Sequence, residues 1–131
     1  MNVKTQLMFQ GKAEEALHLY QKVFTCFEAG PIERYGKEEP NPEGSFKTCE
    51  VSFAGHNILF FDRPPVHEFS FTPAVSLFVD FDRKADLEVA FANLSDQGQV
   101  LMPLGNYGFS EYYGWLKDRF GVSWQLNFPG D

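Results

Sequence analysis

The predicted order of secondary-structure elements, one strand, one helix and three strands, occurs twice along the chain. In the first half, apolar alternation and helical spacing predict elements over Val3–Phe9, Lys12–Val23, Thr25–Ile32, Ser45–Phe53 and Asn57–Asp62. In the second half, they predict elements over Ala74–Phe81, Lys84–Gln97, Val100–Leu104, Tyr112–Asp118 and Ser123–Phe128. A loop with three prolines, residues 63–73, joins the halves. This repeat constrains the fold to two similar α+β units, about 1–62 and 74–131, in one domain.

Each predicted helix has one apolar face, which we expect to be buried. The buried residues are expected to be Ala13, Ala16, Leu17, Tyr20 and Phe24 in the first helix, and Leu87, Ala90, Phe91 and Leu94 in the second. Asp82 precedes the second helix and is a suitable N-cap, because its carboxylate can accept from free backbone amides. Gly98 is expected to end that helix in the left-handed conformation.

The aromatic content is high: 15 of the 131 residues are Phe, and aromatic residues make up 17% of the chain. That much aromatic surface requires a large core, a buried interface or an apolar cavity. A homodimer interface would accommodate part of it.

Charge and hydropathy exclude several kinds of partner. The net charge is −7 and the sequence pI is about 4.9, and the eleven basic residues are scattered. We therefore expect no nucleic-acid partner, because binding to duplexes requires clustered Lys and Arg. We find no long apolar segment that would cross a membrane, and no signal-peptide pattern at the N-terminus. Cys26 and Cys49, each placed in a predicted strand, are expected to be reduced and unreactive, and the expected location is cytoplasmic.

Three stretches of the sequence resemble one family of proteins. The stretches "LMFQGKAEEALHLYQKVF", "FTPAVSLFVDFD" and "VLMPLGNYGFSEYYGWLKDRFGVSWQLNF" are similar to the PhnB-like branch of the vicinal-oxygen-chelate superfamily, which includes glyoxalases, bleomycin-resistance proteins and dioxygenases. This branch also carries the description 3-demethylubiquinone 3-methyltransferase. The resemblance implies that each unit curls into half a barrel around a cleft, and leaves open whether the halves pair within one chain or across a dimer.

The resemblance also implies a divalent metal held by the first and last strands of both units. In this sequence the four ligand positions fall on Lys4 or Thr5, on Phe60 with Asp62 nearby, on Ala74, and on Gln125. Alanine and phenylalanine donate no lone pair, and one amide oxygen cannot hold a metal ion against water. We therefore predict no metal and no other cofactor.

The same positions predict the lining of a ligand-binding cleft. Side chains alternate along a strand, so Ser123, Gln125 and Asn127 share one side while Trp124, Leu126 and Phe128 point toward the helices. On the other strands, Thr5, Phe60, Asp62, Ser76 and Phe78 are expected on the cleft side. The predicted site is mixed, with apolar walls from Phe60 and Phe78 and hydrogen bonds from the polar residues.

Two other groups of residues have both functional and structural interpretations. His67, beside Glu68 in the bridge, could perform acid–base chemistry, although a polar residue on a loop is the simpler interpretation. Trp115, Lys117, Asp118 and Arg119 could form a cleft wall whose Lys or Arg binds an anionic ligand. The favoured interpretation is that Asp118 and Arg119 hold a turn, with Trp115 and Trp124 packed in the barrel.

Three functions remain open at this stage. The first is a metal-free homodimer that binds a small, partly apolar molecule. The second is a metal-dependent lyase or dioxygenase with an atypical site completed by Asp62, Gln125 or His67. The third is a structural or partner-binding dimer. Methyl transfer is not expected, because the chain has no Gly-rich loop of the type that binds S-adenosylmethionine.

The aromatic content and the family's use of two-fold symmetry predict a homodimer. Multi-angle light scattering at micromolar concentration should give twice the monomer mass of 15.0 kDa. A measured mass equal to that of the monomer would contradict this prediction.

Overall fold

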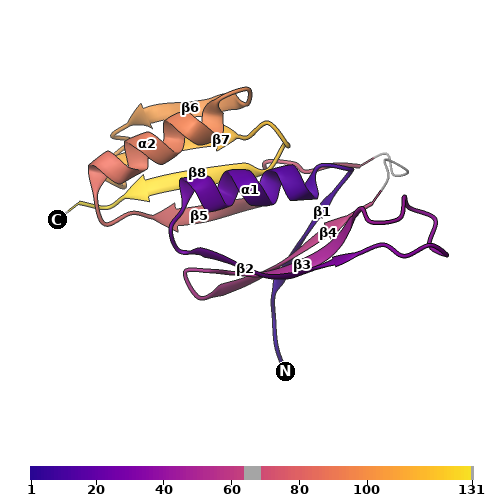
Figure 1. The fold of residues 1–131 in the computed structure, drawn as a ribbon. Helices are drawn as coiled ribbons and strands as arrows, with labels where there is room; N and C mark the ends of the chain where they lie inside the picture. The colour runs from indigo at the N-terminus through magenta and orange to yellow at the C-terminus, as the bar shows by residue number, and fades with distance from the viewer. Residues whose placement is uncertain (64–68, 131) are drawn as a thin grey trace. The chain divides into compact units, whose positions relative to one another are not determined.

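The two halves of the chain each contain one strand, one helix and three further strands, as the sequence predicts (Figure 1). The structure is a computed structural model that describes residues 1–63 and 69–130. It divides into two compact units, Met1–Glu68 and Phe69–Asp131. The first unit contains β1 (Thr5–Phe9), α1 (Ala13–Val23), β2 (Phe27–Arg34), β3 (Phe46–Phe53) and β4 (His56–Asp62). The second contains β5 (Ser76–Asp80), α2 (Lys84–Ser95), β6 (Gln99–Gly105), β7 (Tyr112–Lys117) and β8 (Ser123–Phe128).

Both units have the same sheet topology. The strand orders are β1-β4-β3-β2 and β5-β8-β7-β6, and in each sheet the first strand runs parallel to the last while the other pairs are antiparallel. A parallel pair needs a long crossover connection, which here contains the helix. The expected α+β fold of two repeated units is therefore confirmed.

The core of the first unit is aromatic and lies between α1 and its sheet. The ring of Phe60 lies 5.3 Å from that of Phe9, 6.0 Å from that of Tyr20 and 5.9 Å from that of Phe27. Phe60 and Tyr20 are fully buried. Such ring contacts add about 0.5–1.5 kcal/mol each to the gain from burial. Much of the unusual Phe content thus serves to pack α1.

The core of the second unit is built from Trp124 and several leucines between α2 and its sheet. Trp124, Leu116 and Leu126 have no exposed surface, and neither do Leu87 and Leu94 of α2. Gly114 of β7 lets α2 approach closely, because a Cβ there would lie 2.5 Å from Cε2 of Phe91. The expected apolar faces of both helices are buried as predicted.

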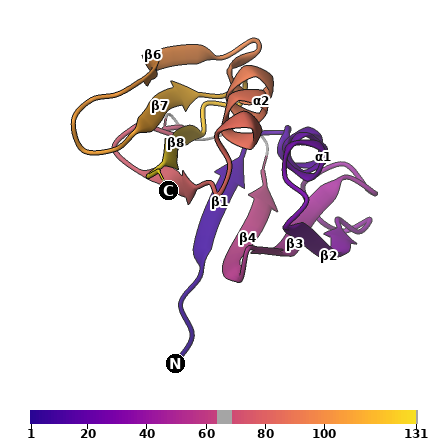
Figure 2. The same ribbon diagram turned by 90° about the vertical axis from the view of Figure 1, so that its left-hand side faces the viewer.

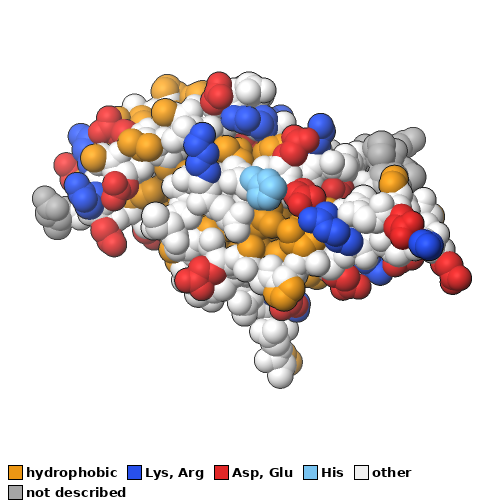
Figure 3. Space-filling view, in the orientation of Figure 1, with side chains coloured by type: hydrophobic (Ala, Val, Ile, Leu, Met, Phe, Trp, Pro, Cys, Tyr) orange, Lys and Arg blue, Asp and Glu red, His pale blue; other side chains and the backbone are white. Residues whose placement is uncertain are grey.

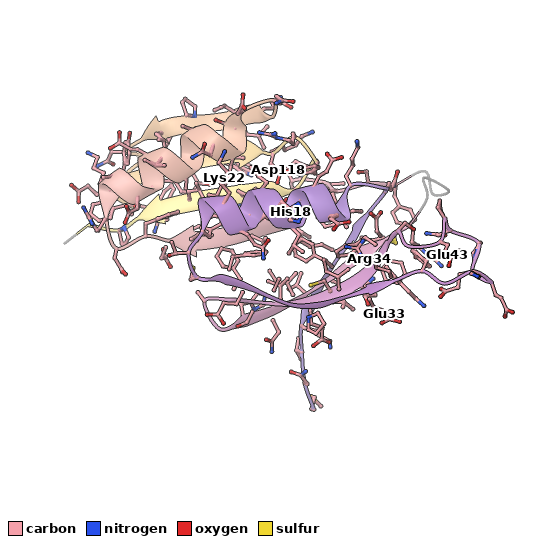
Figure 4. All side chains as sticks on the ribbon, viewed as in Figure 1. His18, Lys22, Glu33, Arg34, Glu43 and Asp118 are labelled. Atoms are coloured by element: carbon pink, nitrogen blue, oxygen red, sulfur yellow. The ribbon has the colours of Figure 1, made fainter. Side chains whose placement is uncertain are left out.

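The buried carboxylate of Asp118 organises the turn between β7 and β8 (Figure 4). Its Oδ1 accepts from the backbone amides of Phe120 and Val122 at 2.9 and 3.0 Å. Its Oδ2 accepts from the indole Nε1 of Trp124 at 2.9 Å. This confirms the expected turn-holding role of Asp118 and the packed position of Trp124. Charge-assisted hydrogen bonds of this kind are among the strong ones in proteins.

The ends of α2 differ from the prediction. Its N-cap is Arg83, not Asp82, and no side chain caps it. The left-handed residue after the helix is Gln97, with φ of 62°, not Gly98. Gly98 is needed for another reason: a Cβ there would collide with the carbonyl oxygen of Lys117 and lie 3.0 Å from Cα of Asp118. The glycine therefore allows the chain to pass close to the end of β7.

Other boundaries differ by only a few residues, but Cys26, which was expected in a strand, lies outside one. Cys26 lies in the turn before β2 and is exposed, whereas Cys49 is buried in β3. Burial raises the pKa of the Cys49 thiol, which therefore stays protonated. His18 lies on the exposed side of α1 (Figure 4). In the view of Figure 3, Lys and Arg side chains stand apart from one another among Asp and Glu.

The described helices include none with the length and apolar character that a membrane crossing requires.

One edge strand of each sheet contains a proline. Pro31 lies in β2 and Pro103 in β6, and the pairing of both strands is interrupted by register shifts. β2 and β6 are edge strands in their own sheets. Proline is tolerated at such positions because no partner strand needs its missing amide.

The close approach at Gly98 generates a stability prediction. Gly98→Ala should lower the free energy of unfolding by about 2 kcal/mol, since the added methyl group meets rigid backbone atoms. Gly105→Ala is the matched control, because the nearest atom to its Cβ is Cε2 of Tyr107 at 3.9 Å. Urea denaturation measures both variants. Equal stability of the two variants would contradict the close approach.

Candidate functional site

The sheet of the second unit has one side that faces α2 and one that does not. Gly114, Leu116, Trp124 and Leu126 face the helix, so the intervening residues point the other way. Strand pairing places Phe78 and Trp115 on either side of Gln125. We call the side opposite α2 the Gln125 face. On β5, β7 and β8 it comprises Ser76, Phe78, Asp80, Tyr113, Trp115, Lys117, Ser123, Gln125 and Asn127.

A row of hydrogen bonds crosses three strands of the Gln125 face. The Tyr113 hydroxyl donates to Oε1 of Gln125 at 2.6 Å, and Nε2 of Gln125 donates to Oγ of Ser76 at 3.1 Å. The hydroxyls of Ser76 and Ser123 lie 2.7 Å apart, and Nε1 of Trp115 donates to Oγ of Ser123 at 2.8 Å. The row fixes the Gln125 amide in one orientation, since donors and acceptors are distinct at each end.

Four aromatic rings gather at one end of this row. The Tyr113 ring lies 4.9 Å from that of Phe109, 5.8 Å from that of Tyr107 and 6.4 Å from that of Phe78. Phe109 is 65% exposed, Phe78 53% and Tyr107 40%. We call these four rings the aromatic cluster. Exposed aromatic residues in mutual contact are typical of binding surfaces.

Tyr113 belongs to both the row and the cluster. Burial, and to a smaller extent the nearby Tyr107 hydroxyl, raise the pKa of Tyr113 above its ordinary value. The Tyr113 hydroxyl therefore stays protonated at neutral pH and keeps donating to Gln125.

Phe109 and Tyr107 are positioned by the loop between β6 and β7, which projects beyond the strand ends in Figure 2. The Tyr107 hydroxyl donates to the carbonyl of Pro103 at 2.5 Å, and the Gly108 amide donates to Oδ1 of Asn106 at 2.8 Å. Ser110 donates to the carbonyl of Phe128 at 2.9 Å and so ties the loop to β8. These bonds hold the two rings beside Tyr113 even though the loop is exposed.

Asn127 has a buried oxygen without a partner in the described part of the chain. Its Nδ2 donates to Oδ1 of Asp80 at 2.8 Å, which fixes the direction of the amide. Its Oδ1 accepts no hydrogen bond, although Asn127 is only 8% exposed. A buried acceptor left without a donor costs about 1–3 kcal/mol, so it marks a place where a ligand or water group would be stabilised.

Four predicted site residues share the Gln125 face, namely Ser76, Phe78, Gln125 and Asn127. Trp124, Leu126 and Phe128 lie on the helix side, as the alternation predicts. Tyr113 and Phe109 were not predicted as site residues, and Trp115 was expected to pack in the barrel. The signal that could have indicated them is the density of aromatic residues in "NYGFSEYYGW".

The predictions for Phe60 and Asp62 as site residues are wrong. Phe60 lies on the α1 side of its sheet, because the alternation in β4 is one residue out of step with the one assumed. Asp62 is buried, and its carboxylate accepts from the backbone amides of Gly11 and Ala13 at the start of α1. Both of its oxygens therefore stabilise a helix N-terminus.

Thr5 belongs to β1 of the first unit. Thr5 shares its side of β1 with the buried Leu7 and Phe9, and its hydroxyl lies 3.0 Å from Nε2 of His56. His67 lies outside the described residues, so the acid–base interpretation stays a hypothesis.

The donors present do not fit the divalent metal that the resemblance implies. Across residues 1–63 and 69–130, no three His, Cys, Asp or Glu side chains are placed to hold an ion. Of the side chains considered as ligands, Gln125 uses Oε1 to accept from Tyr113, and Asp62 holds the start of α1. We derive no chemical step through a metal.

The chain matches one family model and is similar to several solved structures. The model of the 3-demethylubiquinone-9 3-methyltransferase family matches residues 1–127. A PhnB protein from Bacillus cereus is 40% identical to this chain. The alignment covers 98% of this chain and 99% of the Bacillus cereus protein, with a TM-score of 0.91. Protein PA1353 from Pseudomonas aeruginosa is 25% identical over 100% of this chain and 99% of its own, with a TM-score of 0.85.

A more distant structure shares only the fold. The glyoxylase/bleomycin resistance protein/dioxygenase domain from Frankia sp. EAN1pec is 11% identical over 99% of this chain and 98% of its own, with a TM-score of 0.69. Among curated proteins, none matches the chain.

The donor set predicts that the purified, dialysed protein contains far less than one divalent ion per chain by elemental analysis. Added Mn²⁺ or Ni²⁺ should also leave the melting temperature unchanged. If the protein had a metal site, an ion added at 100 times its dissociation constant would instead stabilise the protein by about 2.7 kcal/mol. One ion per chain, or a rise in melting temperature of several degrees, would contradict the prediction.

Proposed function

The chain belongs to the 3-demethylubiquinone-9 3-methyltransferase family, in the PhnB-like branch of the vicinal-oxygen-chelate superfamily, and from this premise we propose that it binds a small, partly apolar molecule on the Gln125 face. The ligand would stack against the aromatic cluster and form hydrogen bonds with the row that contains Gln125. The proposal requires no metal.

The observation that carries the proposal is the double role of Tyr113. Its ring contacts three other rings, and its hydroxyl holds the amide of Gln125. Apolar walls and fixed polar groups therefore meet at one residue, which is the combination that small-molecule sites use. The unpartnered Oδ1 of Asn127 on the same face adds a buried acceptor that a ligand could satisfy.

The expected affinity of a simple aromatic ligand is low. Covering about 120 Å² of apolar surface contributes about 3 kcal/mol at roughly 25 cal/mol per Å². That free energy corresponds to a dissociation constant in the millimolar range, so further hydrogen bonds are needed for tight binding. The natural ligand should therefore use both the rings and the polar row.

Two enzymatic functions receive less support. A metal-dependent reaction lacks a donor cluster among the described residues, and Asp62 is engaged at the start of α1. Methyl transfer of the common kind requires a glycine-rich turn with free amides after a parallel strand. Here the turn between β1 and α1 contains one glycine, Gly11, whose amide already donates to Asp62.

The homodimer and the cytoplasmic location remain proposals of their own. A partner-binding function would use the same exposed rings, Phe78 and Phe109, as its contact surface. Small-molecule binding and partner binding differ in what contacts these rings, and a titration with small molecules tests the first.

Titration of the ¹⁵N-labelled protein with single-ring aromatic compounds tests the proposal. We expect shifts of the Gln125 side-chain amide and the Trp115 indole signals, and none of the Trp124 indole, which is buried on the other side. Phe109→Ala should weaken binding roughly fivefold or more, through lost ring contact of about 1 kcal/mol. Its stability should change little, because Phe109 is 65% exposed.

Val89→Ala provides the matched control. Val89 is 63% exposed on α2, away from the Gln125 face, so this variant removes apolar surface of similar exposure without touching the cluster. Equal loss of binding in both variants, or shifts confined to α2, would contradict the proposed site.

A further inference from the structure

The geometry points to a ligand class: we infer that the Gln125 face binds aromatic compounds through a neutral carbonyl oxygen, which accepts hydrogen bonds from Gln125 and Ser76. This inference rests on the proposed function and specifies its ligand. It follows from the number of donors and acceptors in the row of hydrogen bonds.

The row has more donors than acceptors. Both of its ends, the Tyr113 hydroxyl and the Trp115 indole, donate inward. Between them, Gln125 accepts at Oε1 and donates one of its two N–H groups to Ser76. Only one of the two serines can donate across the 2.7 Å contact between Ser76 and Ser123. One hydroxyl hydrogen and one N–H of Gln125 are therefore left without an acceptor among the described residues.

Burial decides which serine keeps the free hydrogen. Ser123 is 1% exposed, so a hydroxyl hydrogen without an acceptor there would cost about 1–3 kcal/mol. Ser123 therefore donates to Ser76, whose oxygen also accepts from Gln125. The Ser76 oxygen has then used both lone pairs, and its hydroxyl hydrogen must point elsewhere. Ser76 is partly exposed, so this hydrogen is available to a ligand.

The two free donors lie close together. Nε2 of Gln125 and Oγ of Ser76 are 3.1 Å apart, so one oxygen atom of a ligand can accept from both. The aromatic cluster begins beside them, because Phe78 pairs with Gln125 across the strands and contacts Tyr113. A compound with a ring next to a carbonyl group would place both parts at once.

The neutral donors favour a neutral oxygen over a carboxylate. Of the charged residues on this side of β5 and β7, Asp80 pairs with Asn127 and Lys117 pairs with Ser123, so charges of both signs are present. The donors themselves are an amide and a hydroxyl, both neutral. A neutral carbonyl satisfies them without the larger cost of removing a carboxylate from water.

Three probes with the same ring separate these features. Acetophenone has a neutral carbonyl, ethylbenzene has a similar body with no acceptor, and benzoate has a charged acceptor. Two hydrogen bonds of about 0.5–1.5 kcal/mol each predict that acetophenone binds roughly tenfold more tightly than ethylbenzene. Benzoate should bind more weakly than acetophenone. Shifts of the Gln125 side-chain amide signal measure all three affinities.

Gln125→Glu tests the donors without disturbing the row. The carboxylate accepts from Tyr113 at one oxygen and from the Ser76 hydroxyl at the other, so the hydrogen bonds of the row are kept and both free donors disappear. Acetophenone should then bind no better than ethylbenzene, while the affinity for ethylbenzene changes less than twofold. Trp115 indole shifts report binding in this variant. Gln99→Glu, at an exposed position of β6, introduces the same charge and should keep the tenfold preference.

The possible outcomes separate the two proposals. Equal binding of acetophenone and ethylbenzene by the unaltered protein would overturn the ligand class and leave the aromatic site standing. Tighter binding of benzoate would overturn the preference for a neutral oxygen. A tenfold preference that survives in Gln125→Glu would show that Gln125 and Ser76 are not its source. No shift with acetophenone at about 10 mM, roughly ten times or more its expected dissociation constant, would overturn the proposed function as well.

Discussion

A single helix can cover only one side of a four-stranded sheet, and each unit of this chain has one helix. In each unit the helix lies in the crossover that the parallel pairing of the first and last strands requires. Large, fully buried apolar residues of both units face their helices, among them Phe60 and Trp124. The other side of each sheet is left to side chains that the core does not need. The Gln125 face is one such side, and the site follows from this division.

Buried acidic residues hold the chain at two points that define these layers. Asp62 binds the amides at the start of α1, and Asp118 binds two amides and an indole at the turn before β8. Each carboxylate receives several hydrogen bonds, which offsets the cost of removing the charge from water. Neither aspartate is available for chemistry. Asp118 positions β8, and with it Gln125, relative to β7.

The order of elements and the buried faces of both helices could be predicted from the sequence, because both depend on local spacing. The side of each strand was predicted correctly for β8, where polar and large apolar residues alternate clearly. It was wrong for β4, because Ile58, Leu59, Phe60 and Phe61 are all apolar and carry no alternation. The role of Asp62 was not predictable, since its partners lie 49 and 51 residues away along the chain. Nor does spacing show that Tyr107 and Phe109 return to Tyr113 through a loop.

The prolines in β2 and β6 have a consequence for the protein at high concentration. An edge strand normally offers a row of free amides and carbonyls to which another chain can add, and this is how cross-β fibrils grow. Pro31 and Pro103 each remove one such amide, and the register shifts beside them disturb the regular spacing of the others. The 15 Phe side chains of the chain would otherwise favour self-association through apolar contacts. These two residues protect it against fibril growth at β2 and β6 without using any part of the Gln125 face.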